Sequence, residues 1–200
     1  MAKAIHFMTT LFVLLFSTAV VHAADFQQPA ENAMNPAPSV QLNTFQKFEL
    51  VDAGMDPPYA GQESNEVARQ YLQGNISDRV GKVIAVWNEQ PAGDAPRTLK
   101  IEPKIAHIRF ITGGKRFFAG ALAGSSWVYV TVKMTDAETG EVIAEPGFYQ
   151  SGSGRMGGLS FGATDKTMLI RISSMLRAYL QKNYEGQVEI PVRIAPEVED

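Results

Sequence analysis

The stretch Ser126–Asp136, which reads SWVYVTVKMTD, decides the fold of this chain. Apolar and polar side chains alternate along it, and side chains on a β-strand point alternately to opposite faces. The pattern therefore predicts a strand that is buried on one face. The buried face carries Val128, Val130, Val132 and Met134, and the second face carries Trp127, Tyr129, Thr131 and Lys133. The second face is exposed to solvent, covered by the chain's own loops, or used as a contact surface.

The segments on either side of this strand predict its neighbours in a sheet. Ala137–Gly140 (AETG) is typical of a hairpin turn, in which Gly140 takes the positive φ that such turns need. Glu141–Gln150 is then the return strand. Before the first strand, Thr98–Thr112 (TLKIEPKIAHIRFIT) alternates as a long strand with a bend at Pro103. Tight hairpins of this kind indicate mainly antiparallel pairing.

Hydrophobic spacing predicts the remaining strands and helices. Apolar residues three and four positions apart indicate amphipathic helices, and short apolar runs indicate buried strands. Helices that pack on one face of a sheet bury its apolar side. We therefore expect an α+β fold, a twisted, mainly antiparallel sheet of about five strands with two amphipathic helices on one face. The remaining elements are strands at Phe45–Val51, Lys82–Asn88 and Gln187–Ile194, and helices at Ser64–Val80 and Ala163–Tyr184.

The first residues are typical of an export signal. Lys3 supplies a positive start, and Phe7–Val21 is an apolar run too short for a permanent membrane span. We expect cleavage after Ala23, with Ala24 as the second choice and an uncleaved anchor as the alternative. Residues 24–43 contain three prolines and few apolar groups, which is typical of a flexible leader. The predicted organisation is a signal peptide at 1–23, a leader at 24–43, a single α/β domain at 44–194 and an acidic tail at 195–200.

Composition excludes several classes of function. The chain contains no cysteine, so it offers no lipidation cysteine, no thiolate chemistry and no cysteine-based zinc site. Its 18 basic and 21 acidic residues give a net charge of −3, without the basic surplus that nucleic-acid binding needs. We therefore expect no cofactor, no metal and no nucleic-acid partner. After the predicted cleavage the one remaining histidine is His107, which is more typical of a half-exposed strand residue than of a catalytic one.

A set of short motifs runs from about Ala106 to Tyr184: Gly113-Gly114-Lys115-Arg116, Gly120, Gly124, Val128-Tyr129-Val130, the turn Asp136–Glu141 (DAETGE) and Tyr179-Leu180. This set resembles an uncharacterised bacterial envelope family, many of whose members are lipoproteins. That family is similar in architecture to the curli-secretion lipoprotein and to the amino-terminal domain of the TolB translocation protein. The resemblance implies a small α/β envelope domain used for assembly or protein contact, with no assigned catalytic residues. Because this chain lacks the lipidation cysteine, we expect it not to be lipidated.

The most unusual stretch is Gly113–Ser126 (GGKRFFAGALAGSS), in which Lys115 and Arg116 precede Phe117 and Phe118. One interpretation is a mobile loop that presents cations and aromatic rings to a partner or a lipid surface. The other is that the two phenylalanines belong to the core, with the glycines allowing close packing. The sequence favours the core and leaves both open.

The glycine-rich stretch Ser151–Gly158 (SGSGRMGG) carries Arg155 and precedes a predicted helix. It lacks the Gly-Lys-Ser/Thr of a phosphate-binding loop, so a flexible connection is the simpler interpretation.

Taken together, the patterns predict a non-catalytic periplasmic accessory protein that acts in envelope assembly or secretion by contact with an envelope protein. The same patterns allow peripheral contact with a membrane. The alternatives are small-molecule or glycan binding on the aromatic sheet face and, least favoured, a carboxylate-dependent hydrolase. The candidate contact surface consists of Lys115, Arg116, Phe117, Phe118, Trp127, Tyr129, Lys133 and Arg155.

Overall fold

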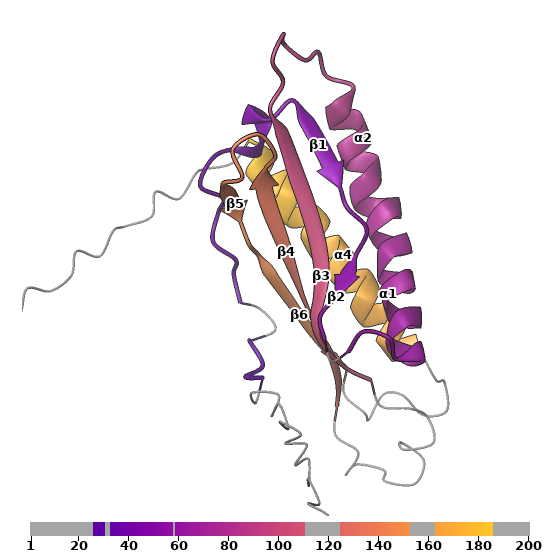
Figure 1. Cartoon of the computed structure of the whole chain (residues 1–200). Coiled ribbons are helices and arrows are strands. Elements are labelled where there is room, and N and C mark those ends of the chain that lie inside the picture. The colour runs from indigo at the N-terminus through magenta and orange to yellow at the C-terminus, as the bar shows by residue number, and fades with distance from the viewer. Residues whose placement is uncertain (1–25, 31–32, 58, 111–124, 153–162, 186–200) are drawn as a thin grey trace, which may run out of the picture.

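The computed structural model describes residues 26–30, 33–57, 59–110, 125–152 and 163–185 of the chain. Within these ranges six strands form one mixed sheet, and helices cover one of its faces (Figure 1). The prediction of an α+β fold with the helices on a single face is therefore confirmed. No helix of the described ranges combines the length and the apolar character needed to cross a bilayer. The predicted signal peptide, the strand at Gln187–Ile194 and the acidic tail lie outside these ranges.

Two long antiparallel strands, β3 (Thr98–Arg109) and β4 (Ser126–Asp136), form the centre of the sheet. Each edge of the sheet is made of two short strands. On one edge, β1 (Lys47–Leu50) and β2 (Gly54–Met55) pair with β3 in parallel orientation. On the other, β4 pairs in antiparallel orientation with β5 (Val142–Ala144) and β6 (Gly147–Gly152).

Prolines mark the point where each edge is interrupted. Pro103 of β3 has no N–H to donate, and it lies at the level where β1 has ended and β2 has not yet begun. Pro146 lies between β5 and β6, so the predicted return strand Glu141–Gln150 is divided in two. At Pro103, where the sequence predicts a bend, the pairing of β3 with β4 is regular, and the register shifts at Ala106.

Asparagine side chains cover both sheet edges in the same way. On the first edge, the amide of Asn88 accepts a hydrogen bond from the Phe48 N–H (2.8 Å) and donates one to the Phe48 carbonyl (3.0 Å). On the second edge, Asn35 does the same with the N–H (2.8 Å) and carbonyl (2.9 Å) of Gly147. Each amide thus imitates the backbone of a further strand, which hides edge groups that could otherwise pair with another chain.

A long helical rod joins β2 to β3. α1 (Glu63–Ile76) continues through a π-helical turn, η2 (Ser77–Gly81), into α2 (Lys82–Asn88) without leaving helical backbone angles. The prediction of a buried strand at Lys82–Asn88 is therefore wrong. Val86 in this segment is 56% exposed, which a strand inside a sheet would not allow. The buried positions instead repeat every four residues along the rod, at Leu72, Ile76, Val80 and Ile84.

The rod also decides the direction of the first strand. Because a helix carries the chain back along the sheet, β3 starts at the same end as β1 and runs parallel to it. The sheet is consequently mixed, with parallel pairs on one side of β3 and antiparallel pairs from β3 onward. Antiparallel pairing still dominates, as the hairpin at Gly140 predicts, and this glycine has the expected positive φ of 76°.

The hydrophobic core lies between the inner face of the sheet and the helices. The last helix, α4 (Ala163–Tyr184), has the bounds that the sequence predicts, and it runs behind the sheet beside the rod (Figure 1). A short 3₁₀ turn, η1 (Leu42–Thr44), adds Leu42 to the same core. On β4 the four residues predicted to face inward are each 0% exposed. The fully buried helix residues of the same core include Leu72, Ile76, Ile172, Leu176 and Leu180.

Candidate functional site

The outer face of the sheet, opposite the helices, carries a group of aromatic side chains. We call Phe26, Tyr59, His107, Trp127 and Tyr129 the outer aromatic cluster. His107 pairs with Tyr129 across β3 and β4, and the next outward pair is Arg109 with Trp127. The predicted second face of β4 is thus real, and the cluster occupies the end of it that lies nearest Trp127.

A β-bulge places the histidine on this face. Ile105 of β3 is buried in the core, and strict alternation from it would turn the histidine two residues later inward as well. The register shifts between Ile105 and His107, so Ala106 is the extra residue and His107 faces outward. Ile108 then returns to the core with 4% exposure. The bulge therefore places the His107 ring within the outer aromatic cluster.

Phe26 lies at the centre of the cluster. Its ring is stacked on His107, with centroids 4.0 Å apart, and on Trp127, with centroids 5.1 Å apart. Its ring also meets Tyr129 at 5.3 Å in a tilted arrangement. Contacts of this kind between aromatic rings are favourable beyond the apolar area that they bury. One side chain from the amino-terminal segment therefore covers two strands of the sheet.

His107 is also held from a second side. The Tyr59 hydroxyl lies 3.1 Å from Nδ1 of His107 in hydrogen-bonding geometry, and the two rings meet edge to face. Burial lowers the pKa of His107 below its ordinary value, and the nearby Asp56 carboxylate opposes that shift only in part. Asp56 itself is paired with Lys104 at 3.1 Å. The imidazole is therefore neutral at neutral pH and serves as a partner of Tyr59.

The segment that bears Phe26 is attached to the sheet mainly through side chains. The Tyr149 hydroxyl donates to Oε1 of Gln28 (2.7 Å), and the Tyr179 hydroxyl of α4 donates to the Pro36 carbonyl (2.9 Å). Asn35 holds Gly147 as described above. The described part of the predicted leader thus contacts the sheet and α4 through these side chains, and Phe26 adds its three ring contacts.

Two further observations describe how the side chains of the cluster are packed and hydrogen-bonded. Tyr129 lies so close to Gly147 that a Cβ at this glycine would come within 2.7 Å of the tyrosine Cζ atom, so only glycine leaves room for the ring. The indole Nε1 of Trp127 is buried and has no hydrogen-bond partner among the described residues. The cluster is thus tightly packed at one end and has an unused donor at the other.

The sequence-predicted contact residues fall into two groups. Trp127 and Tyr129 are half-buried in the cluster, and Lys133 lies exposed further along the outer face of β4. Lys115, Arg116, Phe117, Phe118 and Arg155 lie outside the described residues. Sequence reasoning missed Phe26 and Tyr59. A usable signal for Phe26 was present, because it is the one aromatic residue of the segment 24–43.

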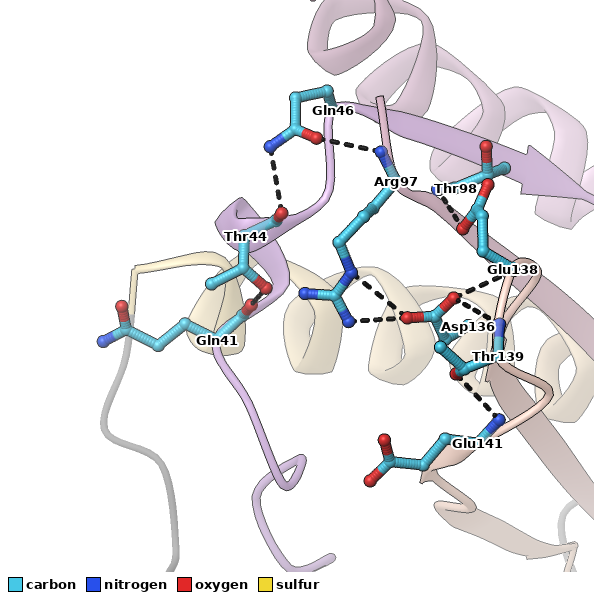
Figure 2. Close-up of polar contacts among 9 residues, drawn as sticks. All are labelled: Gln41, Thr44, Gln46, Arg97, Thr98, Asp136, Glu138, Thr139 and Glu141. Carbon is cyan, nitrogen blue, oxygen red and sulfur yellow. Dashed lines mark hydrogen bonds and ion pairs between the residues drawn. The ribbon is translucent and has the colours of Figure 1, made fainter. Parts of the chain in front are cut away.

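The turn Asp136–Glu141, one of the motifs behind the family resemblance, forms a separate polar network (Figure 2). Oδ1 of Asp136 accepts hydrogen bonds from the N–H groups of Glu138 (2.9 Å) and Thr139 (3.1 Å). Oδ2 of the same carboxylate accepts two from Arg97, through Nη2 (2.5 Å) and Nε (3.1 Å). The Asp136 side chain is fully buried, and these donors, Arg97 first, lower its pKa from 3.8 to about 2.

The partners of this network fasten the turn to the start of β3. The Glu138 carboxylate accepts the Thr98 N–H at 2.9 Å, and the Arg97 guanidinium lies over the Phe45 ring at 4.5 Å (Figure 2 shows the polar contacts). Every strong contact of Asp136 is thus internal to the fold. The motif has a structural role here, which agrees with its interpretation as a hairpin turn.

The described residues contain no group of three or more histidine, cysteine, aspartate or glutamate side chains that could hold a metal ion. No known family model matches the chain, and no curated protein matches it either.

Solved structures with a similar arrangement come from several bacteria. A PelC dodecamer from Paraburkholderia phytofirmans is 15% identical, with a TM-score of 0.37 over 73% of this chain and 93% of the other. A Caulobacter crescentus protein described as a lipoprotein is 12% identical, with a TM-score of 0.38 over 74% and 95%. A Xanthomonas campestris protein is also 12% identical, with a TM-score of 0.37 over 73% and 96%. At these values the function must be argued from the site itself.

Proposed function

We propose that this chain is a non-catalytic accessory protein of the bacterial cell envelope, exported to the periplasm, where it binds another protein through the outer face of its sheet. The observation that carries this proposal is the outer aromatic cluster, a group of rings gathered on a sheet face that the helices do not cover. Aromatic residues and arginine are the side chains most enriched in protein interfaces. Arg109, exposed and paired in register with Trp127, lies beside the cluster.

The arrangement of His107 supports binding over acid–base catalysis. A catalytic base needs a ring nitrogen within reach of a substrate proton. Here Nδ1 is bonded to Tyr59, and the face of the ring is stacked on Phe26. The Asp136 carboxylate, whose pKa is lowered, is occupied by Arg97 and by its own turn. Export to the periplasm rests on the predicted signal peptide at residues 1–23.

In-cell photo-crosslinking tests the proposal. A photoreactive amino acid is placed at Lys133, on the outer face, or at Val67 of α1, which is 61% exposed on the helical side and serves as the matched control. We expect position 133 to yield an adduct with one envelope protein and position 67 to yield none. Equal adducts at both positions, or none at position 133, contradict contact through the outer face. Detection of the uncleaved chain in the cytosol contradicts the location.

A second candidate is the binding of a small molecule or glycan on the same face. The buried, unpartnered Nε1 of Trp127 favours it, because sugars stack on aromatic rings and offer hydroxyl acceptors. Titration with cell-wall oligosaccharides, followed by isothermal titration calorimetry, separates the two candidates. Saturable binding that is lost in Trp127→Ala, together with no adduct at position 133, replaces protein contact with glycan binding.

A further inference from the structure

The outer aromatic cluster has a removable cover. Residues 26–36, which we call the amino-terminal strap, form no strand in their described part. Among the described residues, the polar contacts that join the strap to the body use a side chain of one partner, as in the pairs Gln28–Tyr149, Asn35–Gly147 and Pro36–Tyr179. Met34, near the carboxyl end of the strap, is 91% exposed. The strap is therefore held by one ring and a few side-chain hydrogen bonds.

The hydrophobic core on the opposite face of the sheet contains no described residue of the strap. The core residues of β4 point to the opposite face and are buried by the helices, so lifting Phe26 uncovers Trp127 and Tyr129 without opening the core. The order of the strands is likewise set by pairs that do not include the strap. A segment with the same chemistry can consequently take the place of the strap while the fold stays intact.

The cover also leaves binding groups unused. Nε1 of Trp127 is buried without an acceptor among the described residues, although indole N–H groups normally find one. Arg109, paired in register with Trp127 on the outer face, is exposed and forms no ion pair with any described residue. One carboxylate placed near this pair would satisfy both donors, because guanidinium and indole N–H groups each bind a carboxylate oxygen.

We propose that the outer aromatic cluster binds an extended segment of a partner protein that carries an aromatic residue beside an acidic residue, and that this segment displaces the amino-terminal strap. The aromatic ring takes the place of Phe26 on His107 and Trp127. The carboxylate is bound by Arg109 and the Trp127 N–H. This inference rests on the proposed function and names the kind of partner segment that the site accepts.

A peptide titration tests this inference. The probe is a synthetic peptide based on residues 24–38 in which Asp25 is replaced by asparagine and Gln27 by aspartate, ANFDQPAENAMNPAP, so that its aspartate follows the phenylalanine instead of preceding it as in this chain. The protein is the full exported chain with Trp87→Phe, so that Trp127 is the one fluorescent tryptophan, with or without Phe26→Ala. We expect saturable binding to the Phe26→Ala chain. Binding to the chain with Phe26 is at least about tenfold weaker, because a tethered strap competes at an effective concentration in the millimolar range.

Variants of the peptide separate recognition from simple stickiness. Replacing its phenylalanine by alanine should weaken binding about tenfold or more, and replacing its aspartate by asparagine several-fold. Arg109→Gln in the protein should remove the difference between the aspartate and asparagine peptides. Equal binding of all three peptides, or no binding to a folded Phe26→Ala chain, overturns the inference. If Phe26→Ala fails to fold, Asn35→Ala loosens the strap while keeping the ring, and the same titration applies.

Two other outcomes identify a different occupant. A concentration-dependent dimer that is lost in Phe26→Ala assigns the cluster to the strap of a second copy and overturns the proposed partner. Competition by an oligosaccharide but not by the peptide assigns it to a glycan. The crosslink at position 133 is independent of these results. If the adduct forms and the peptide does not bind, the proposed function stands and this inference fails, whereas a missing adduct contradicts the proposed function.

Discussion

The two faces of β4 are built from alternating residues of one strand, yet they are covered in different ways. The inner face, from Val128 to Met134, is fully buried in the core between the sheet and the helices, with α4 packed against it. The outer face, with Trp127 and Tyr129, is half-buried, and its cover is Phe26 from the far end of the chain. The inner face therefore carries the stability of the fold, and the outer face is available for recognition. Four predictions test this difference, from the largest expected effect to the smallest.

The largest effect is expected in the inner layer. Leu176 of α4 is 0% exposed, so Leu176→Ala leaves a cavity in the core. It should lower the free energy of unfolding by about 2–5 kcal/mol. Urea denaturation followed by circular dichroism measures the change. Arg177→Ala, at the exposed next position, is the control and should stay within about 0.5 kcal/mol of the wild type. Similar losses in both variants would contradict the assignment of the core.

The next effect concerns the buried charge at the end of the inner face. The pKa of Asp136 is lowered from 3.8 to about 2 in the folded chain, so its stabilising contribution is present above about pH 4 and is lost as the pH falls from 4 to 2. Asp136→Asn removes this contribution. At pH 7 the Tm of the variant should be lower by roughly 5 °C or more, and the gap should close towards pH 2.

Calorimetry across this pH range measures the gap between the two Tm curves. Asp94→Asn, at an exposed loop position, provides the control and should follow the wild-type curve. A gap that stays constant from pH 7 to pH 2 would show that the Asp136 carboxylate is not held in its charged form by Arg97 and the turn.

A smaller effect is expected where the outer face packs tightly. Gly147→Ala places a methyl group against the Tyr129 ring, which has to move, and this should cost about 1–3 kcal/mol of unfolding free energy. Gly74→Ala is the matched control, because outside the adjacent backbone of its own helix nothing lies within 4 Å of the added Cβ. That control should stabilise α1 by about 0.5–1 kcal/mol. If Gly147→Ala is neutral, the outer face is more loosely packed than its contacts indicate.

The smallest effect on stability is expected for the strap. Phe26→Ala should lower the free energy of unfolding by about 1 kcal/mol or less, because it removes stacking but leaves the core intact. In a Trp87→Phe background, quenching of Trp127 by acrylamide should nevertheless rise clearly. Stability and exposure are thus expected to respond separately at this position. A loss as large as that of Leu176→Ala would make Phe26 part of the core and would remove the distinction between the two faces.

Local patterns predicted those parts of the fold that local periodicity controls. The alternation in Ser126–Asp136 gave the strand and its two faces, and the apolar stripe in Ala163–Tyr184 gave α4 with its bounds. The turn at Gly140 followed from the need for a positive φ. Each of these features depends on neighbours in the sequence, so a single stretch contains the information.

The errors arose where distant contacts decide. Lys82–Asn88 is apolar enough for a strand, but it continues the four-residue spacing that ends at Ile84 and packs as a helix. His107 faces outward because of a bulge at Ala106, which alternation alone does not predict. Phe26 lies in a proline-containing stretch with few apolar neighbours, and its partners on β3 and β4 are about a hundred residues away. Of the candidate site, the sequence therefore identified Trp127 and Tyr129 but not their cover.

By itself the sequence determined the α+β class, the strand with one apolar and one aromatic face, and the absence of cysteine chemistry. Only the tertiary structure decided that β1 runs parallel to β3, that a bulge turns His107 outward and that Phe26 covers Trp127. The reason is physical. Periodicity records which side of an element is apolar, whereas the free energy of covering a surface depends on every segment that can reach it, however far away in the chain.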